Sequence, residues 1–532
     1  MQRNLLLIGV NSKYTHSNLA IRYISAYANI PFFECTINDD IFSVYSKLIE
    51  KQADVFCFSV YIWNVEFVTK LCKMLYSARP YLKIIFGGPE AGYDKEALFE
   101  KHNWLFGVCT GEGEDCFLSL KQGESLENIP NLSYRENNKI KVNSLLKTDL
   151  NKVKFPYQKS DVEGDLKNRI IYFETSRGCL FNCAYCLSSN EGKTRTFPME
   201  YVKDGLKFFM DNQVPLVKFV DRTFNENNER ATEIVSFILE NNKVTRFHFE
   251  IAPQLLTEEF INLCAKKPEF FQFEMGIQTT NLDTMKAIKR SCDLNKTAEK
   301  ILSVPKSIHQ HLDLIAGLPY ETIDSFKEGF NYVYALKPHM LQVGFLKLLK
   351  HTNLMNDAKE YGIVTTEFPP YEVLCTNSMK AETIIKLKHL ENAVDRIYNS
   401  GAFNKTLENI KIDNAFDFYM ELGDKLYKKE YSAPLSRTAL YEFMYENFPK
   451  MKKSLAVDFL NNNRKAALPE CFTDSSENAK QIHKLLSKHE KFNGKKFRLI
   501  FASDCIFSVT EDSVTEVTEL IREFSLQDQY HE

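Results

Sequence analysis

Between residues 174 and 186 the chain reads Glu174-Thr175-Ser176-Arg177-Gly178-Cys179-Leu180-Phe181-Asn182-Cys183-Ala184-Tyr185-Cys186, with three cysteines at the spacing CxxxCxxC. An apolar run at residues 170–173 directly precedes it, so we expect the cysteines on a loop that leaves a buried strand. Thiolates are soft ligands that iron–sulfur clusters prefer. A loop this short can wrap one small inorganic core, so the stretch predicts a metal centre.

Three cysteines are one ligand fewer than a closed site needs. A cluster held by three thiolates leaves one iron open, whereas a structural zinc site is filled by four ligands. Two other interpretations stay open at this point. Zinc sites usually show two CxxC pairs or spaced histidines, and no histidine lies near this stretch. An electron-carrier cluster would take a fourth cysteine from elsewhere, and Cys264 and Cys292 are candidates.

The cysteine spacing, with the aromatic Tyr185 directly before the third cysteine, resembles the signature of the radical S-adenosylmethionine (radical SAM) superfamily. The resemblance implies a 4Fe-4S cluster on Cys179, Cys183 and Cys186, with the open iron chelating the amino and carboxylate groups of SAM. It also implies that an electron from the cluster splits the sulfonium and gives a deoxyadenosyl radical.

Composition limits the possible partners. The chain has 532 residues, and 67 basic against 70 acidic side chains give a net charge of −3. No global field therefore favours nucleic acid or an anionic membrane, and the basic spot at residues 450–453 is typical of a solvated face. The opening residues do not resemble a secretory signal, and no apolar stretch approaches the roughly 20 residues of a spanning helix. We expect a soluble, cytoplasmic protein whose thiols stay reduced.

Residues 1–125 alternate short apolar runs with amphipathic helices, which predicts a Rossmann-like, doubly wound α/β domain. Ligands of such a sheet bind beyond the carboxyl ends of the strands, where glycine lets the backbone approach closely. Two glycine-rich turns follow expected strands, Gly87-Gly88-Pro89-Glu90 and Thr110-Gly111-Glu112-Gly113-Glu114. The expected strands are residues 4–10, 32–37, 54–60, 83–86 and 105–109.

These turns resemble the cobalamin-binding domain that precedes the barrel in one branch of the radical SAM superfamily, which implies cobalamin as a cofactor. Relatives that ligate cobalt from below use an Asp-x-His-x-x-Gly loop after the first strand. The corresponding stretch here, Tyr14-Thr15-His16-Ser17-Asn18-Leu19, lacks the aspartate and the glycine. Since a histidine ligand normally needs an acceptor that orients it, we expect His16 to be structural. A first domain that only recognises substrate is the alternative.

The rest of the chain divides into three parts. Residues 126–165 are polar and turn-rich, which predicts a linker with a hairpin at residues 132–142. Residues 166–350 alternate strands and helices, which predicts a partial (β/α)6 barrel. Residues 351–532 predict a mainly α-helical domain with a late strand near residues 498–507, and they resemble the extra domain of an uncharacterised radical SAM group. The expected barrel strands are residues 170–173, 216–220, 246–251, 270–277, 309–315 and 340–346.

The carboxyl ends of barrel strands carry the chemistry of such folds. Residues 273–278 and 313–319 resemble the SAM-contacting strands of radical SAM barrels, which implies Gln278 as a SAM contact and Tyr185 as a neighbour of adenine. Asp221, Arg222 and Glu250 also end expected strands and are further candidates for binding the cofactor. Each has a structural alternative, either a local ion pair or a bond to a neighbouring loop. No catalytic residue is assigned.

The leading hypothesis is a radical SAM enzyme that uses cobalamin to methylate an unactivated carbon. Because the cluster must be reduced at low potential, a flavodoxin- or ferredoxin-type electron donor follows. One alternative is another radical reaction, such as rearrangement or cyclisation, with substrate recognition by the first domain. Another is an iron–sulfur electron carrier or sensor. The substrate, a small molecule or a peptide, is not encoded in these motifs because specificity lies in loops.

Overall fold

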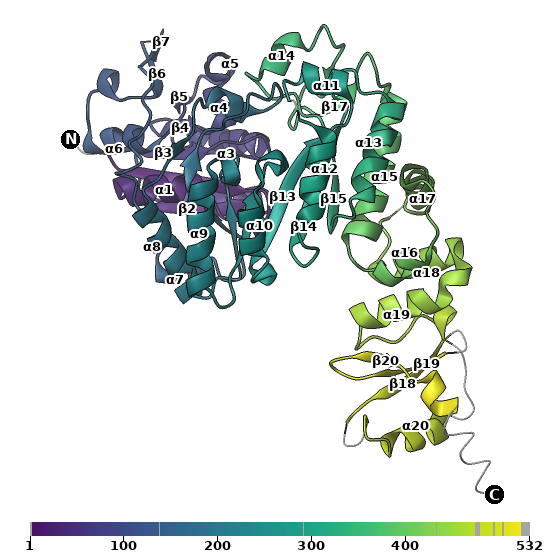
Figure 1. The fold of residues 1–532 in the computed structure, drawn as a ribbon. Coiled ribbons are helices and arrows are strands. Elements are labelled where there is room, and N and C mark those ends of the chain that lie inside the picture. The colour runs from purple at the N-terminus through teal and green to yellow at the C-terminus, as the bar shows by residue number, and fades with distance from the viewer. Residues whose placement is uncertain are drawn as a thin grey trace, which may run out of the picture. The chain divides into compact units, whose positions relative to one another are not determined.

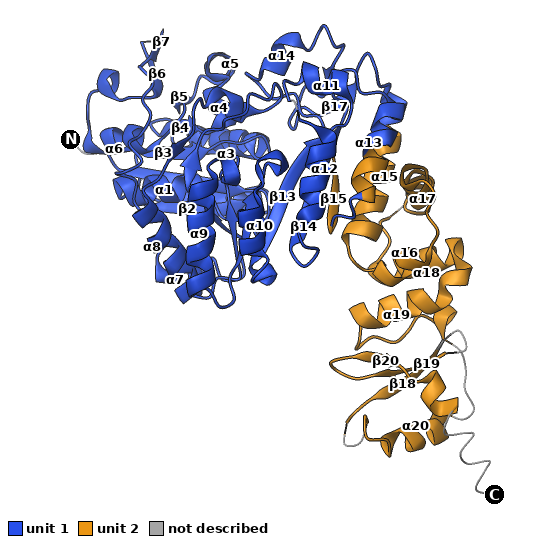
Figure 2. Cartoon of the chain, viewed as in Figure 1, with its two compact units in different colours: residues 1–329, 336–338, 344–384 blue, residues 330–335, 339–343, 385–532 orange. Residues whose placement is uncertain are grey.

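The computed structural model describes residues 3–137, 139–290, 292–431, 433–473, 479–492, 495–502 and 505–522. The chain divides into two compact units, coloured separately in Figure 2. The first unit contains residues 1–329, 336–338 and 344–384, and the second contains residues 330–335, 339–343 and 385–532.

A seven-stranded sheet with the order β2-β1-β3-β4-β5-β6-β7 organises the beginning of the first unit (Figure 1). Its first five strands pair in parallel and match the predicted runs to within one residue. The order reverses between β1 and β3, and ligands of open α/β sheets bind at such a reversal. These strands are β1 (Leu5–Asn11), β2 (Phe32–Thr36), β3 (Val55–Ser59), β4 (Lys83–Gly87) and β5 (Leu105–Cys109).

Apolar side chains on both faces of this sheet build two separate cores. One core joins Phe56 and Phe58 of β3 to α2 (Ile41–Ile49) and α3 (Val65–Ala78). The other joins Val55 and Cys57 of the same strand to α1 (Leu19–Ala28) and α6 (Glu114–Gln122). Successive residues of a strand point to opposite faces, so the continuous apolar runs explain why helices cover both sides. The predicted doubly wound domain is confirmed.

The hairpin that the sequence placed in a linker belongs to this first sheet. Strands β6 (Leu132–Glu136) and β7 (Lys139–Val142) pair antiparallel with each other, and β6 pairs antiparallel with β5. Leu132 and Tyr134 are buried in the core between the sheet and α6, whereas β7 is exposed along its length. Polar turn residues marked the hairpin, but they carry no information about the sheet that it joins.

Six strands with the order β15-β14-β13-β12-β11-β8 form the barrel sheet, and the strands from β8 to β14 pair in parallel. Every strand matches its predicted run to within one residue, which confirms the partial barrel. Along β13, Phe271, Phe273, Met275 and Ile277 are buried, and the alternate residues are only half-buried. The strands are β8 (Ile171–Phe173), β11 (Leu216–Phe219), β12 (Arg246–Glu250), β13 (Phe271–Gln278), β14 (His309–Ala316) and β15 (Met340–Phe345).

Aromatic rings fill the space between the barrel sheet and its outer helices, which include α8 (Met199–Asp211), α9 (Asn228–Asn241) and α10 (Glu258–Cys264). Phe249 is fully buried, and its ring stacks on Phe224 with centroids 3.9 Å apart. It also meets Phe219 edge-on at 4.8 Å. The apolar positions of the strands thus pack outward, which leaves the alternate polar positions on the inner face of the barrel.

The second unit is mainly helical, as predicted. Its three-stranded antiparallel sheet corrects the single late strand, because β18 (Arg498–Ala502) and β19 (Cys505–Val509) form a hairpin that β20 (Val514–Glu516) extends. Within the described residues, no helix combines the length and apolarity needed to cross a membrane. The main helices are α17 (Ala415–Lys429), α18 (Arg437–Asn447), α19 (Lys452–Asn462) and α20 (Ala479–Ser487).

Removing the Phe249 ring tests this packing. Phe249→Ala leaves a cavity in the aromatic layer, so we expect the free energy of unfolding to fall by about 3–5 kcal/mol. Urea unfolding followed by circular dichroism measures this loss. The exposed Phe42 of α2 gives the matched control, and Phe42→Ala should change stability by no more than about 0.5 kcal/mol. Equal effects of both variants would contradict the assignment of the core.

Candidate functional site

The cysteine loop leaves the barrel sheet through a short two-stranded ladder. Strand β9 (Ser176–Arg177) pairs antiparallel with β10 (Arg195–Thr196), which closes the base of the loop. Gly178 has φ = +100°, and a Cβ there would lie 2.9 Å from the carbonyl oxygens of Gly192 and Lys193. Only glycine fits this position, so the ladder and Gly178 together fix where the loop begins.

The three cysteines lie on this loop as the sequence predicted. Cys183 is buried, and Cys179 and Cys186 are half-buried. Burial raises the pKa of Cys179. Two contacts oppose this rise: the Phe181 backbone N–H donates to Cys179 Sγ at 3.4 Å, and the Thr223 hydroxyl lies 3.7 Å from the same sulfur.

A guanidinium that the sequence did not single out joins the cysteine loop to the barrel. Arg290 donates from Nη1 to Cys183 Sγ at 3.7 Å and from Nη2 to the Gly276 carbonyl oxygen at 2.5 Å. Tyr185 lies beside the same two groups, and burial raises the pKa of its hydroxyl. Arg290 therefore places a positive charge next to the most buried of the three loop cysteines.

Gln278 ends β13 in a strained conformation. Its φ is +72°, and the pairing of β13 with β14 shifts register between Gly276 and Gln278. The side-chain amide folds back over Gly276 and leaves no room for a Cβ there. A side chain at Gly276 would also come within 3.6 Å of Arg290 Nη2, so Gln278 and Arg290 lie together. Backbone strain of this kind is typical of functional sites, where surrounding contacts maintain it.

Asp221 and Arg222 make contacts with other residues than Gln278 and Arg290 do. Asp221 is buried and accepts hydrogen bonds from the Thr175 N–H at 2.7 Å and the Ser176 hydroxyl at 2.9 Å, with a further bond from the Thr175 hydroxyl. Burial raises its pKa and these bonds oppose the rise. The carboxylate thus holds the start of the cysteine loop. Arg222 is exposed and faces Glu191 across 3.7 Å.

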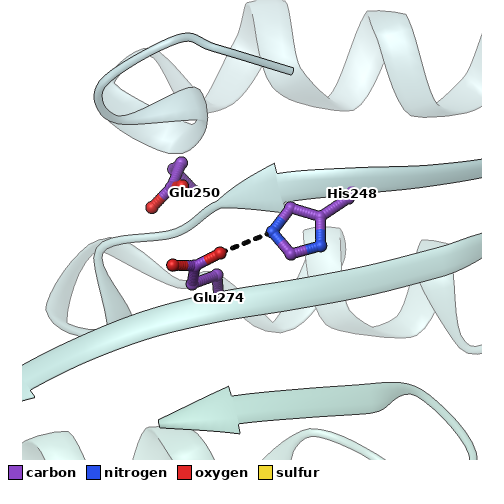
Figure 3. A group of neighbouring side chains, drawn as sticks. All are labelled: His248, Glu250 and Glu274. Atoms are coloured by element: carbon purple, nitrogen blue, oxygen red, sulfur yellow. Dashed lines mark hydrogen bonds and ion pairs between the residues drawn. The ribbon is translucent and has the colours of Figure 1, made fainter. Parts of the chain in front are cut away.

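Charged side chains meet on the inner face of the barrel at Glu274 (Figure 3). His248 Nε2 lies 2.8 Å and Lys218 Nζ 2.9 Å from Glu274 Oε2. Burial raises the pKa of Glu274, but these partners outweigh burial and hold it at about 2. Glu250 pairs only loosely with Lys218, at 3.9 Å, and burial together with the nearby negative charge of Glu274 raises its pKa to about 8. Glu274 is thus ionised and fully paired, whereas Glu250 is a carboxyl group short of partners.

Two groups of side chains on this face contain residue types that can bind a metal ion, and the groups share Glu274. The first is His248, Glu250 and Glu274, and the second is Glu274, His311 and Asp313. His311 Nε2 and Asp313 Oδ1 lie 2.9 Å apart. The ammonium of Lys218 already occupies the Glu274 oxygen that both groups share, so an added cation must compete with it. The arrangement is better described as a charge network, with three carboxylates facing one lysine and two histidines.

His16 is tied to the barrel through its ring. Its Nδ1 lies 2.6 Å from the Tyr172 hydroxyl, and the two rings stack. Burial and the nearby Lys13 lower its pKa. These contacts agree with the predicted structural histidine.

Two cysteines outside the loop were candidates for a fourth ligand. Cys264 is fully buried and its pKa is raised, which disfavours a thiolate. Cys292 is half-buried and lies near Arg290.

Arg177, in the stretch quoted first, connects the loop to the first sheet. Its guanidinium lies 3.0 Å from Glu174, 2.6 Å from Glu114 and 3.4 Å from Glu112. Arg195 pairs with the same Glu112. Glu112 and Glu114 belong to the glycine-rich turn after β5. The loop and this turn are therefore one electrostatic unit.

The partners of Arg177, Arg290 and Lys218 could not be read from the sequence. Arg290 and Cys183 are separated by 107 residues, and Arg177 and Glu114 by 63. A single sequence shows a basic residue after a helix or on a strand, but not the acidic group or sulfur that it meets. The sequence did indicate the region of the site, because Glu274 and Gln278 fall near the carboxyl end of a predicted barrel strand.

Comparisons with known proteins agree with this architecture. Residues 5–121 match the B12 binding domain, residues 173–333 the radical SAM superfamily, and residues 359–502 a family described as a protein of unknown function (DUF4080). The chain thus carries a radical SAM domain with a B12-binding domain ahead of it, which is the domain combination of the predicted branch.

Two curated relatives are methyltransferases. The cobalamin-dependent radical SAM methyltransferase TokK of Streptomyces tokunonensis is 24% identical over 343 residues, 59% of this chain and 50% of the relative. The 2-(S-pantetheinyl)-carbapenam-3-carboxylate methyltransferase of Streptantibioticus cattleyicolor is 24% identical over 309 residues, 52% of this chain and 44% of the relative. The chain thus spans about half the length of these curated relatives.

A solved structure of the cobalamin-dependent S-adenosylmethionine radical enzyme OxsB with aqua-cobalamin bound is similar in fold. It matches with a TM-score of 0.63 at 15% identity, over 92% of this chain and 84% of that chain. The likeness at this identity concerns the fold alone. It agrees with a Rossmann-like domain, a radical SAM barrel and a helical region in one chain.

Replacing Arg177 tests the charge network that joins loop and first sheet. Arg177→Met leaves Glu174, Glu112 and Glu114 without their shared cation, so we expect a loss of about 3–5 kcal/mol in the free energy of unfolding. Urea unfolding of the apoprotein measures the loss. Arg177→Lys should not restore it, because one ammonium cannot serve three carboxylates in a fixed fork. Arg246→Met, at an exposed position, is the control, and an equal loss there would contradict the network's importance.

Proposed function

We propose that this protein is a cobalamin-dependent radical SAM enzyme that transfers a methyl group to an unactivated carbon of its substrate. One observation carries the proposal. A three-cysteine loop of the radical SAM domain lies in direct ion-pair contact with the glycine-rich turn of a domain that matches the B12-binding family. When bound, a 4Fe-4S cluster with SAM supplies a deoxyadenosyl radical, and cobalamin supplies a transferable methyl group.

The chain's own residues suit a 4Fe-4S cluster. Cys179, Cys183 and Cys186 are the proposed ligands, and all three are free cysteines on one short loop. The Phe181 N–H favours a thiolate at Cys179 against the effect of burial, and the Arg290 guanidinium lies 3.7 Å from Cys183 Sγ. Three ligands leave one iron for SAM. Cys292 stays as the candidate fourth ligand of the alternative, an electron carrier or sensor.

The inner face of the barrel suits SAM, which carries a sulfonium and an ammonium charge and one carboxylate. Arg290, beside Cys183, is positioned to pair with the carboxylate, because a guanidinium binds carboxylate through two parallel bonds. Glu250, which pairs only loosely with Lys218, is the proposed acceptor for an N–H of the SAM amino group. Gln278 and Tyr185 are proposed to contact the rest of the cofactor. Asp221 and Arg222 contact residues on either side of the three cysteines, so their proposed role is to position the cysteine loop.

The carboxyl edge of the first sheet suits a corrinoid held without a histidine. Gly88 has φ = +96°, and a Cβ there would lie 2.5 Å from the Val60 carbonyl oxygen, so two turns of the crevice pack closely. His16, the histidine nearest this edge in sequence, shares a short contact with Tyr172 through Nδ1.

The proposed domain bounds are residues 1–125, 126–165, 166–350 and 351–532. The hairpin at residues 132–142, which lies within the second of these segments, belongs to the sheet of the first domain.

Three finer proposals accompany this function. Reduction of the cluster requires a flavodoxin- or ferredoxin-type donor, because such clusters work at low potential. A cytoplasmic location fits a site built from reduced thiols. The substrate is a small molecule or a peptide that reaches the inner face of the barrel, where water must be excluded and distances set.

Loss of a single cluster ligand tests the radical step. Anaerobic reconstitution with iron and sulfide, followed by SAM and dithionite, should give deoxyadenosine with the wild type. Cys183→Ala should lower deoxyadenosine at least about 100-fold, because a cluster ligand is essential. Cys72→Ala, which removes a buried thiol of the first core, is the matched control. Deoxyadenosine from Cys183→Ala at the wild-type level would contradict the site.

The proposed role of Glu250 predicts a pH dependence of SAM binding. Its pKa of about 8 leaves the carboxyl group mostly neutral at pH 7, and rising pH gives the anion, which is a stronger acceptor for the N–H groups of the SAM amine. SAM affinity should therefore rise up to about tenfold between pH 7 and pH 9 and level off above the pKa. Glu250→Gln should remove this rise. Equilibrium dialysis with labelled SAM measures both, and the same rise in the variant would contradict the role.

A further inference from the structure

The segment that follows the last barrel strand touches three different parts of the first unit. We name residues 347–375 the post-barrel strap. It contains α14 (Asn353–Asp357) and β17 (Val373–Cys375), both labelled in Figure 1. Its second half overlaps the region that matches a family of unknown function, which begins at residue 359. No role for this region follows from the radical SAM or B12-binding domains.

The strap contacts the cysteine loop through the backbone. The Leu354 N–H donates to the Ala184 carbonyl oxygen at 2.8 Å, between Cys183 and Cys186. The Asn190 side-chain amide of the loop donates to the His351 carbonyl oxygen at 2.8 Å. The strap thus holds the loop at the position that carries two of its cysteines.

The strap also contacts the carboxyl edge of the first sheet. Lys350 Nζ lies 2.8 Å from Glu90 and 2.7 Å from Asp94, and the Tyr371 hydroxyl donates to Glu90 at 2.5 Å. Glu90, which is 8% exposed, ends the Gly87-Gly88-Pro89-Glu90 turn after β4. The buried carboxylate and Asp94, together with the Lys350 ammonium, form a compact ion-pair group.

A third contact reaches the turn after β3 and the end of β14. Pro369 and Pro370 of the strap line a small pocket together with Ile62 and Trp63 of the β3 turn. Val373 packs on Gly317, where a Cβ would lie 2.7 Å from Val373 Cγ1. The strap therefore spans the crevice edge, the cysteine loop and the barrel end at once.

We propose that the post-barrel strap is a wall of the corrinoid crevice and a positioning element, with Lys350 as the residue that fixes it to the turn after β4. This inference rests on the proposed function, since it assumes a corrinoid at the carboxyl edge of the first sheet. Methyl transfer requires reacting groups within contact distance, and a misplacement of about 1 Å is costly. One segment bonded to both the cysteine loop and the crevice edge sets that spacing.

The test is the affinity of the full-length protein for hydroxocobalamin, measured by equilibrium dialysis after cluster reconstitution. Lys350→Met removes both ion pairs, so we expect hydroxocobalamin binding to weaken about tenfold or more, because the wall is no longer preorganised. Lys350→Arg should recover most of the affinity. The exposed neighbour Lys347 provides the control, and Lys347→Met should stay within about twofold of wild type.

A second variant guards against a folding defect. Tyr371→Phe removes one hydroxyl and keeps the ring, and we expect about a threefold loss of affinity with unchanged iron content and circular dichroism. Wild-type affinity in both Lys350→Met and Tyr371→Phe would overturn the inference, as would tighter binding in Lys350→Met, which would make the strap a competitor of the corrinoid. Failure of the wild type to bind hydroxocobalamin would instead contradict the proposed function.

Discussion

A buried guanidinium, Arg177, is the interaction on which the arrangement of the first unit depends. Its side chain is 13% exposed and meets Glu174 of its own segment together with Glu112 and Glu114 of the first sheet. Burial lowers the pKa of Arg177, but these carboxylates outweigh burial and raise it. Arginine suits this place because five N–H donors in a rigid fork can serve three carboxylates, and the desolvated charges are stable only while all stay paired.

Both glycine-rich turns of the first sheet carry glutamates that form ion pairs with basic residues beyond that sheet. Glu112 and Glu114, after β5, pair with Arg177 just before the cysteine loop, and Glu90, after β4, pairs with Lys350 of the post-barrel strap. Glycine gives the turns their close approach, and the glutamates bond them to the barrel. The crevice edge is thus tied to the radical SAM domain at two neighbouring turns, which gives the two proposed cofactor sites one rigid frame.

Most of the architecture could be predicted from the sequence because buried strands leave a local signal. The runs around Phe56 and Phe86 are largely apolar, and those around Phe249 and Phe273 alternate apolar with polar residues. Each became a strand within one residue of its expected ends. The cysteine loop was readable for the same reason, since three ligands lie in one short stretch. The hairpin at β6 and β7 was recognised, but its sheet was not, because pairing with β5 is a non-local fact.

The electrostatic part of the site could not be predicted. Arg290 and Lys350 are ordinary basic residues in the sequence, and only the fold brings them to Cys183 and Glu90. Asp221 ended an expected strand and was a candidate cofactor contact, yet its oxygens accept bonds from Thr175 and Ser176. Glu250, by contrast, stays short of partners on the inner face. Long-range pairing thus separates candidates that the sequence treats alike.

The central claim is that a three-cysteine iron–sulfur cluster and a corrinoid occupy one unit of this chain. Anomalous X-ray diffraction at the iron and cobalt edges, on crystals of the reconstituted protein with hydroxocobalamin and SAM, tests it most directly. The account predicts iron beside Cys179, Cys183 and Cys186 with SAM on the open iron, and cobalt at the carboxyl edge of β1, β3 and β4. A fourth protein ligand on the cluster, or cobalt absent from that edge, would contradict it.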